Sequence, residues 1–290
     1  MTLINYLNRV HFADGVLEDA LWGELDSRPS RPILLIADDG TDQPELIERV
    51  QASVPNRNTV LLQREICRIP SEPAATRLAK VHQSMGCSTI VACGSAGIMN
   101  LGKVVRLAVS QTRPLSDLSV SEGGGLRIVG NLPDMIAVPL LDGVIESSSG
   151  TASVELSDGT RVDLSSDKLI PTVTICDPTL VPVSSAEDVA NTCVVAATRC
   201  IEALISPNYN PPANGIALDG LVRALKCLGS HESDIGREAM AACMNASLVQ
   251  QKGCGLAFAI ADTLERETEV QFERGDPVSY THLRAHETNE

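Results

Sequence analysis

Aromatic side chains are scarce in this sequence, with one Trp, three Tyr and three Phe among 290 residues. A core with so few rings must be filled by Ala, Val, Ile and Leu, which suits parallel strands covered by helices. Hydrophobic residues still make up 43% of the chain, and its length allows two packed domains or one large one. The composition therefore favours a globular α/β protein.

Basic residues are also few, because 23 Lys and Arg stand against 37 Asp and Glu and the formal net charge is −14. Without a dense Lys/Arg face, neither a nucleic acid nor an anionic membrane is expected as a partner. The sequence has no run of about 18 apolar residues and no basic N-terminal segment followed by an apolar one. We therefore expect a cytoplasmic protein.

Paired cysteine motifs are missing as well. The nine cysteines include no CxxC pair, and most lie among apolar neighbours, which is typical of buried free thiols. A disulfide framework or a zinc site is therefore not expected. The motifs GxSxG, HExxH and GxxxxGK[ST] are also absent, so no serine-hydrolase, zinc-protease or P-loop signal is present.

What the first half of the chain does contain is an alternation of strand and helix patterns. Apolar runs predict strands at 32–39, 59–62, 88–93 and 134–139, with helices near 46–50, from 72 to a stop at Gly86, and over 98–110. Such alternation indicates βαβ units and a parallel sheet. Residues 151–164 alternate in polarity on either side of 157–160, which predicts a β-hairpin with a type I′ turn.

The pattern changes after Pro178. A capping box over 184–187 begins a stretch that is helical in pattern to about residue 267, with breaks at 206–207, 210–212 and 229–230. We place a domain boundary near residue 182, which gives an α/β domain over 1–182 and an all-helical domain over 183–273. Residues 274–290 do not continue the pattern and look like a translated adapter sequence, so we exclude them from the fold.

The turn Gly94-Ser95-Ala96-Gly97 joins the strand at 88–93 to the helix that follows. Small residues there let backbone N–H groups and the helix N-terminus approach a diphosphate without a side chain in the way. The same residues also suit a tight strand–helix turn that binds no ligand. The spacing alone leaves both interpretations open.

Motifs over roughly residues 10 to 265 resemble the iron-containing alcohol dehydrogenase superfamily, in the order found there. Residues 94–103 are similar to the GGGSxxDxAK loop and helix of that family, and residues 12–17, 138–141, 169–178 and 201–218 match further segments. Within the superfamily the sequence resembles the glycerol dehydrogenases and the maleylacetate reductases, and it is most similar to the maleylacetate reductase branch. The resemblance implies a Rossmann-like domain followed by an all-α domain, the dehydroquinate synthase-like architecture, and a homodimer.

The resemblance also implies NAD or NADP as cofactor, with hydride transfer between its nicotinamide and a small alcohol or carbonyl substrate. Leu140 and Leu141 replace two threonines of the family, so hydroxyl contacts to the cofactor are lost there. The cofactor-binding residues that the resemblance assigns are Gly94, Ser95, Ala96, Gly97, Asn100, Lys103, Gly40, Leu140 and Leu141.

In the family a divalent metal, Fe or Zn, polarises the substrate oxygen and is held by an Asp, by a His four residues later and by two further His. The first two positions are Val195 and Arg199 in this chain, while Phe258 and Asp262 stand in a later family segment with two His. Val195 cannot bind a metal, and the fixed charge of Arg199 opposes a dication. We therefore expect the family's metal ligands to be substituted here.

Three hypotheses remain at this point. The chain is an NAD(P)-dependent oxidoreductase, or it is an inactive descendant that serves as a binding or oligomerising subunit. It is also expected to be incomplete at its C-terminus, because family members continue for several more helices. The sequence identifies neither the substrate nor the choice between NAD and NADP.

The remaining titratable residues receive no catalytic role. His82 on a helix and His231 in a loop are expected at the surface. His282 and His286 have metal-ligand spacing but fall in the excluded tail. Asp38, Asp142 and Glu146 lie near the ends of predicted strands, where acids are usually solvated, and no nucleophile motif accompanies them.

Overall fold

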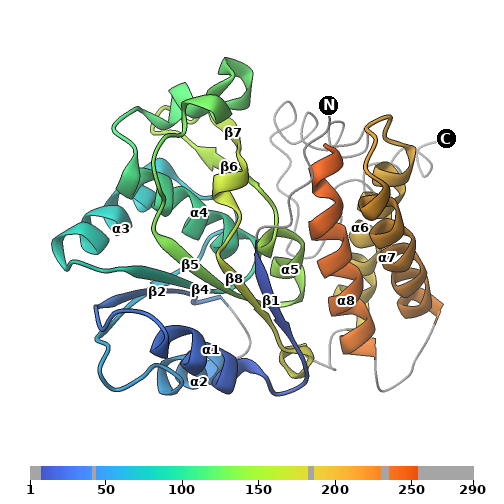
Figure 1. Ribbon diagram of the computed structural model, residues 1–290, viewed down its shortest axis with the longest axis horizontal. Coiled ribbons are helices and arrows are strands. Elements are labelled where there is room, and N and C mark those ends of the chain that lie inside the picture. Colours follow the sequence, from blue (N-terminus) through green and yellow to red (C-terminus); the bar gives the residue numbers. More distant parts are fainter. Residues whose placement is uncertain (1–7, 41–43, 182–185, 230–234, 254–290) are drawn as a thin grey trace. The chain divides into compact units, whose positions relative to one another are not determined.

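The computed structural model describes residues 8–40, 44–181, 186–229 and 235–253. The chain divides into two compact units, one over Leu7–Leu180 and one that contains the chain from Val181 onward. The first is an α/β unit and the second is helical (Figure 1).

A six-stranded parallel sheet forms the centre of the α/β unit, with strand order β1-β8-β5-β4-β2-β3. The predicted parallel sheet is thereby confirmed. Its strands are β1 (Arg9–Phe12), β2 (Ile33–Asp38), β3 (Val60–Glu65), β4 (Thr89–Gly94), β5 (Asp134–Pro139) and β8 (Val173–Cys176).

Helices cover both faces of this sheet, with α1 and α2 on one face and α3 and α4 on the other (Figure 1). Alternate residues of β2 enter two separate cores, Leu34 and Ile36 on the α3/α4 side and Ile33 and Leu35 on the α1/α2 side. The helices of this unit are α1 (Leu17–Asp26), α2 (Pro44–Ala52), α3 (Glu72–Ser84), α4 (Ala96–Ser110) and α5 (Leu141–Ser147).

Local signals set the ends of α3. Ser71 is its N-cap and accepts a hydrogen bond from the Ala74 N–H, Pro73 lies in the first turn, and Gly86 follows the helix with a φ of 66°. A left-handed φ suits glycine, which explains why the predicted stop ends the helix.

The predicted hairpin is present as β6 (Thr151–Glu155) and β7 (Arg161–Ser165), but its turn differs from the expectation. The Gly159 N–H donates to the Leu156 carbonyl, so Ser157 and Asp158 are the central residues, and Gly159 is left-handed with a φ of 84°. This is a longer loop closed by a glycine rather than a two-residue type I′ turn, because the glycine lies after the turn instead of within it. Short 3-10 helices complete the unit: η1 (Leu115–Leu118), η2 (Val120–Glu122), η3 (Gly124–Arg127), η4 (Asp167–Leu169) and η5 (Pro178–Leu180).

The helical unit contains α6 (Ala186–Ile205), α7 (Pro211–Gly229), α8 (Ile235–Leu248) and η6 (Val249–Lys252). The ends of α6 and α7 fall at the predicted breaks, and the Asn210 side chain accepts from the Ala213 N–H at the start of α7. The predicted capping box at 184–187 and the helical pattern beyond 253 lie outside the described residues. In the part of the chain that is described, no helix combines the length and the apolar character needed to cross a membrane.

Burial of the cysteines follows the prediction, whereas burial of His82 does not. Every described cysteine is a free thiol, and each is buried except Cys67, which is partly buried. The expectation that His82 is solvated is wrong, because its exposed fraction is 5%. It shares the inward stripe of α3 with Ala75, Leu78 and Ala79, three and four residues apart.

Candidate functional site

The strand order of the sheet reverses between β2 and β4. From β2 the chain moves outward to β3 and then returns to β4 on the other side of β2. Ligands of open parallel sheets bind at such a point, outside the carboxyl ends of the strands. β2 ends at Asp38 and β4 at Gly94, so both residues lie at the reversal.

The predicted loop 94–97 occupies this position, with Ser95 as the N-cap of α4. A Cβ on Gly94 would lie 2.4 Å from the Asp38 Cβ, and the φ of Gly94 is 142°. A Cβ on Gly97 would lie 1.8 Å from the carbonyl oxygen of Cys67. Both glycines are therefore required by close approach of backbone and neighbours, as in a phosphate-binding turn.

Asp38 joins the ends of β2 and β4. Its Oδ1 atom accepts from the Gly40 N–H at 2.9 Å, and its Oδ2 atom accepts from the Ser95 N–H at 3.2 Å and from the Ser95 hydroxyl. Only 2% of Asp38 is exposed. The expectation of a solvated acid was wrong, because neighbouring strand ends bring amide donors to the carboxylate.

Asp142 holds the next amide of the same loop. Its Oδ2 atom accepts from the Ala96 N–H at 3.1 Å, and the residue is partly buried in the first turn of α5. Burial raises the pKa of the Asp142 carboxyl, the N–H groups of Ala96 and Gly143 lower it, and the charge of Asp38 raises it. The net pKa lies above its ordinary value, so the expectation of a solvated acid is corrected here too.

The two leucines of the predicted cofactor site lie at the same edge of the sheet. Leu140 is the N-cap of α5 and donates its N–H to the Gly94 carbonyl at 2.8 Å, and Leu141 is 7% exposed. The structure thus brings Gly40, the 94–97 loop, Leu140 and Leu141 together. The strands before them end at the same edge of the sheet, and Asp38 bonds both Gly40 and Ser95.

Lys103, which the resemblance assigned to the cofactor, has its amino group held elsewhere. The side chain is fully buried, and Nζ donates to the Ser149 hydroxyl and the Thr151 carbonyl, both at 2.7 Å, and to the Asn100 side chain at 3.4 Å. Glu146 lies 3.7 Å away. Burial lowers the pKa of Lys103 to about 8. Through these hydrogen bonds Lys103 connects α4 to the start of β6.

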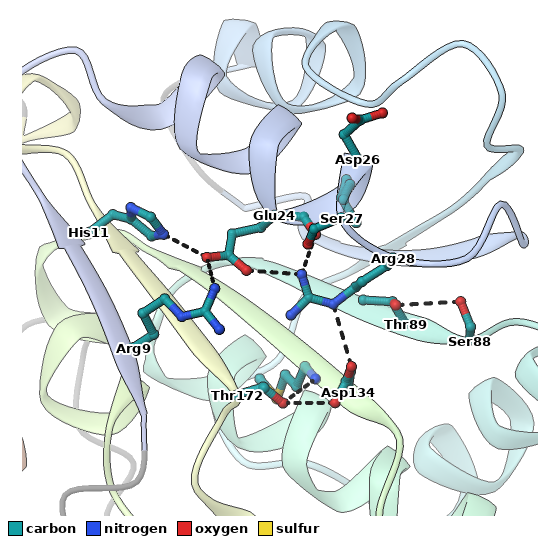
Figure 2. Close-up of polar contacts among 12 residues, drawn as sticks. Arg9, His11, Glu24, Asp26, Ser27, Arg28, Ser88, Thr89, Asp134 and Thr172 are labelled. Carbon is teal, nitrogen blue, oxygen red and sulfur yellow. Dashed lines mark hydrogen bonds and ion pairs between the residues drawn. The ribbon is translucent and has the colours of Figure 1, made fainter.

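A second polar cluster surrounds Glu24, near the amino ends of β1 and β5 (Figure 2). Arg9 and His11 contact its Oε1 atom at 2.7 and 2.8 Å, and Arg28 contacts Oε2 at 3.0 Å. Burial raises the pKa of Glu24, but hydrogen bonds from His11, Arg28 and Arg9 outweigh it and leave the pKa below its ordinary value. Through these contacts the cluster joins α1 to the sheet.

The two positions that the sequence resemblance assigns to the family's first metal ligands lie on α6. Val195 and Arg199 are one turn apart, both are partly buried, and neither offers a donor to a cation. Phe258 and Asp262 lie outside the described residues. No three His, Cys, Asp or Glu side chains in the described ranges are arranged to hold a metal ion. Neither Val195 nor Arg199 therefore supplies a ligand atom for a metal ion.

Comparison with known sequences connects this geometry to a family. The sequence model of the iron-containing alcohol dehydrogenase family matches residues 8–178, which is more than half of the chain. The 4-hydroxybutyrate dehydrogenase of Cupriavidus necator is 28% identical over 269 residues, and the match covers 91% of this chain and 70% of that protein.

Solved structures share the fold at lower identity. A 1,3-propanediol oxidoreductase matches with a TM-score of 0.81 and 19% identity, over 93% of this chain and 72% of that one. A maleylacetate reductase from Rhizobium matches with a TM-score of 0.74 and 16% identity, over 93% and 72%. The sulfoacetaldehyde reductase from Bifidobacterium kashiwanohense, solved in complex with NAD+, has a TM-score of 0.76 and 16% identity, over 96% and 74%. This chain belongs to the iron-containing alcohol dehydrogenase family, as shown by the family match over residues 8–178, and its parallel sheet and loop 94–97 agree with that.

Proposed function

We propose that this chain is an NAD(P)-dependent oxidoreductase that transfers a hydride between the nicotinamide and an alcohol or carbonyl substrate. The observation that carries the proposal is the loop 94–97, which lies at the N-terminus of α4 and at the strand-order reversal. Membership of a dehydrogenase family and a structural neighbour solved with NAD+ support the same conclusion.

Backbone groups of the first turn of α4 are the proposed contacts to the diphosphate. The first intrahelical bond runs from the Met99 N–H to the Ser95 carbonyl, so the N–H groups of Gly97 and Ile98 have no acceptor within the helix. Gly40 would supply a further backbone approach, while Leu140 and the buried Leu141 would offer apolar surface at the nicotinamide end. The bound nicotinamide supplies or accepts the hydride.

A short hydroxy acid is the proposed substrate class. Its support is the similarity to a 4-hydroxybutyrate dehydrogenase over most of this chain. Because Val195 and Arg199 offer no donor to a cation, we also propose that this chain does not use the family's ligand set.

Binding of the reduced cofactor tests the proposal directly. We expect NADH or NADPH to raise the melting temperature of the purified chain, since a ligand that binds only the folded state stabilises it by mass action. Ala96→Asp adds a negative charge to the loop, and it is expected to abolish this rise while leaving the helix intact, because acids suit a helix N-terminus. Pro73→Asp places the same charge in the first turn of α3 and serves as the matched control.

The outcomes separate clearly. A wild-type melting temperature that neither NADH nor NADPH changes would reject the proposal. A rise in wild type that Ala96→Asp leaves unchanged would place the cofactor away from this loop. The substrate class is tested by the oxidation of 4-hydroxybutyrate with NAD+ or NADP+. Formation of the reduced nicotinamide is followed by its absorbance at about 340 nm.

A further inference from the structure

Two carboxylates from different elements are bonded to consecutive amides at the start of α4. Asp38, at the end of β2, accepts from the Ser95 N–H at 3.2 Å. Asp142, in the first turn of α5, accepts from the Ala96 N–H at 3.1 Å. These amides belong to the turn that the proposed function assigns to the cofactor diphosphate, so negative charge already lies where an anion would bind.

The two carboxylates differ in their hydrogen-bond donors and in their burial. Asp38 receives the N–H groups of Gly40 and Ser95 and also the Ser95 hydroxyl, and it links two strand ends. For Asp142, burial outweighs the hydrogen bonds that it accepts, and the charge of Asp38 adds to the cost of ionisation. The pKa of Asp142 therefore lies above its ordinary value even before a further negative charge approaches.

Further charged groups lie on the elements next to Asp142. Glu146 lies one turn further along α5, and it is paired with the buried Lys103 of α4 at 3.7 Å. From β2 the facing group is Asp38, which is itself acidic. A diphosphate at this turn would lie close to Asp38 and Asp142, and protonation of Asp142 removes its repulsion of the added negative charge.

We propose that Asp142 links cofactor binding to proton uptake, so that the dinucleotide binds the form of the protein in which Asp142 is protonated. The inference rests on the proposed function, because it concerns the same loop. As a positioning residue, Asp142 keeps the Ala96 amide in place in the free protein and becomes a neutral neighbour of the diphosphate in the complex. The affinity for the cofactor then falls as the pH rises, by as much as tenfold per pH unit where one proton is taken up.

Calorimetric titration measures that proton directly. NADH is titrated into the chain at pH 6, 7 and 8, each in two buffers of different ionisation enthalpy, and the dependence of the observed heat on that enthalpy gives the number of protons taken up. ADP-ribose, which has the diphosphate but no nicotinamide, is the second probe. NADPH is avoided because a monoester phosphate titrates near about pH 6.

We expect uptake that approaches one proton at pH 8 for both probes in wild type. In Asp142→Asn the amide oxygen can still accept from the Ala96 N–H but cannot be protonated in this range. That variant is expected to take up no proton and to bind NADH with an affinity that is independent of pH and at least about tenfold tighter than wild type at pH 8. Glu146→Gln, which neutralises the next acid on α5, is expected to keep the uptake of wild type.

The result that overturns the inference is binding of NADH without proton uptake in wild type, or uptake that persists in Asp142→Asn. Either result leaves the proposed function intact, since the cofactor still binds. If NADH and ADP-ribose fail to bind wild type at every pH, and NADPH also leaves its melting temperature unchanged, the proposed function is overturned and this inference with it. Binding without proton uptake in wild type overturns the inference even if Asp142→Asn does not fold, and Asp142→Ser is the second variant that assigns the proton.

Discussion

His82 is a polar ring inside an apolar core. Its Nε2 atom is buried without a hydrogen-bond partner among the described residues, and burial lowers the pKa of the imidazole below its ordinary value of 6.5. The imidazole of His82 therefore stays neutral in the folded protein, whereas in the unfolded chain it takes up a proton as the pH falls through 6.5. Stability from this group is present above that pH and is lost below it.

His82→Leu is expected to reduce the acid sensitivity of the fold. Urea unfolding at pH 7.5 and 5.5 should show a smaller loss of unfolding free energy for the variant than for wild type, by at most about 1.4 kcal/mol for one pH unit below the unfolded pKa. The comparison uses the difference between the two pH values, so a change in packing that acts equally at both does not affect it. Equal losses in the two proteins would contradict the assignment.

Periodicity could have identified His82 as buried, whereas no sequence signal identifies the partners of the two aspartates. His82 continues the stripe of Leu78 and Ala79 on α3, and the stripe is visible without a structure. Asp38 and Asp142 instead bind amides that are 57 and 46 residues away. Which strand ends meet depends on the order of the strands in the sheet, and composition and spacing along the chain do not determine that order.

Lys103 acts between elements, because its buried amino group connects α4 to the start of β6 through Ser149 and Thr151. Its pKa is lowered from 10.5 to about 8, so the unfolded chain binds the proton more tightly than the folded one. Between these two values the stability of wild type should rise with pH, since the cost of burying the charged amine disappears. The full effect is on the order of 3 kcal/mol.

Lys103→Met keeps the length of the side chain without the titrating group. The unfolding free energy of wild type minus that of Lys103→Met, measured by urea denaturation from pH 7.5 to 10.5, is expected to increase steadily. Other titrating groups, including the buried thiols, are common to both proteins and cancel in this difference. Lys80→Met, at an exposed position of α3, should show no such trend, and a flat difference for Lys103→Met would contradict the role of the buried amine.

The bounds of strands and helices with a clear apolar pattern agree with the bounds predicted from the sequence, whereas short elements were not predicted. β5 has the predicted limits and α3 begins and ends at its cap and its glycine stop, because these signals are local. α5 was not predicted, since its seven residues are too few to show a helical period. β1 has four residues and pairs with β8 more than 160 positions away, so its place at the sheet edge depends on tertiary contacts.

At the scale of the molecule, the fold is that of the iron-containing alcohol dehydrogenase family, and helix α6 has Val195 and Arg199 at the two positions that the sequence resemblance assigns to metal ligands. We expect the purified wild-type chain to contain no stoichiometric iron or zinc by plasma mass spectrometry, and its melting temperature to be unchanged by EDTA or added Zn²⁺. The double variant Val195→Asp with Arg199→His places a carboxylate and an imidazole four residues apart on one helical face. We expect Zn²⁺ to raise the melting temperature of this double variant by mass action.

For the wild-type chain, one bound metal ion per chain would contradict the expected absence of iron and zinc, since other residues would then have to supply a complete ligand set without either α6 position.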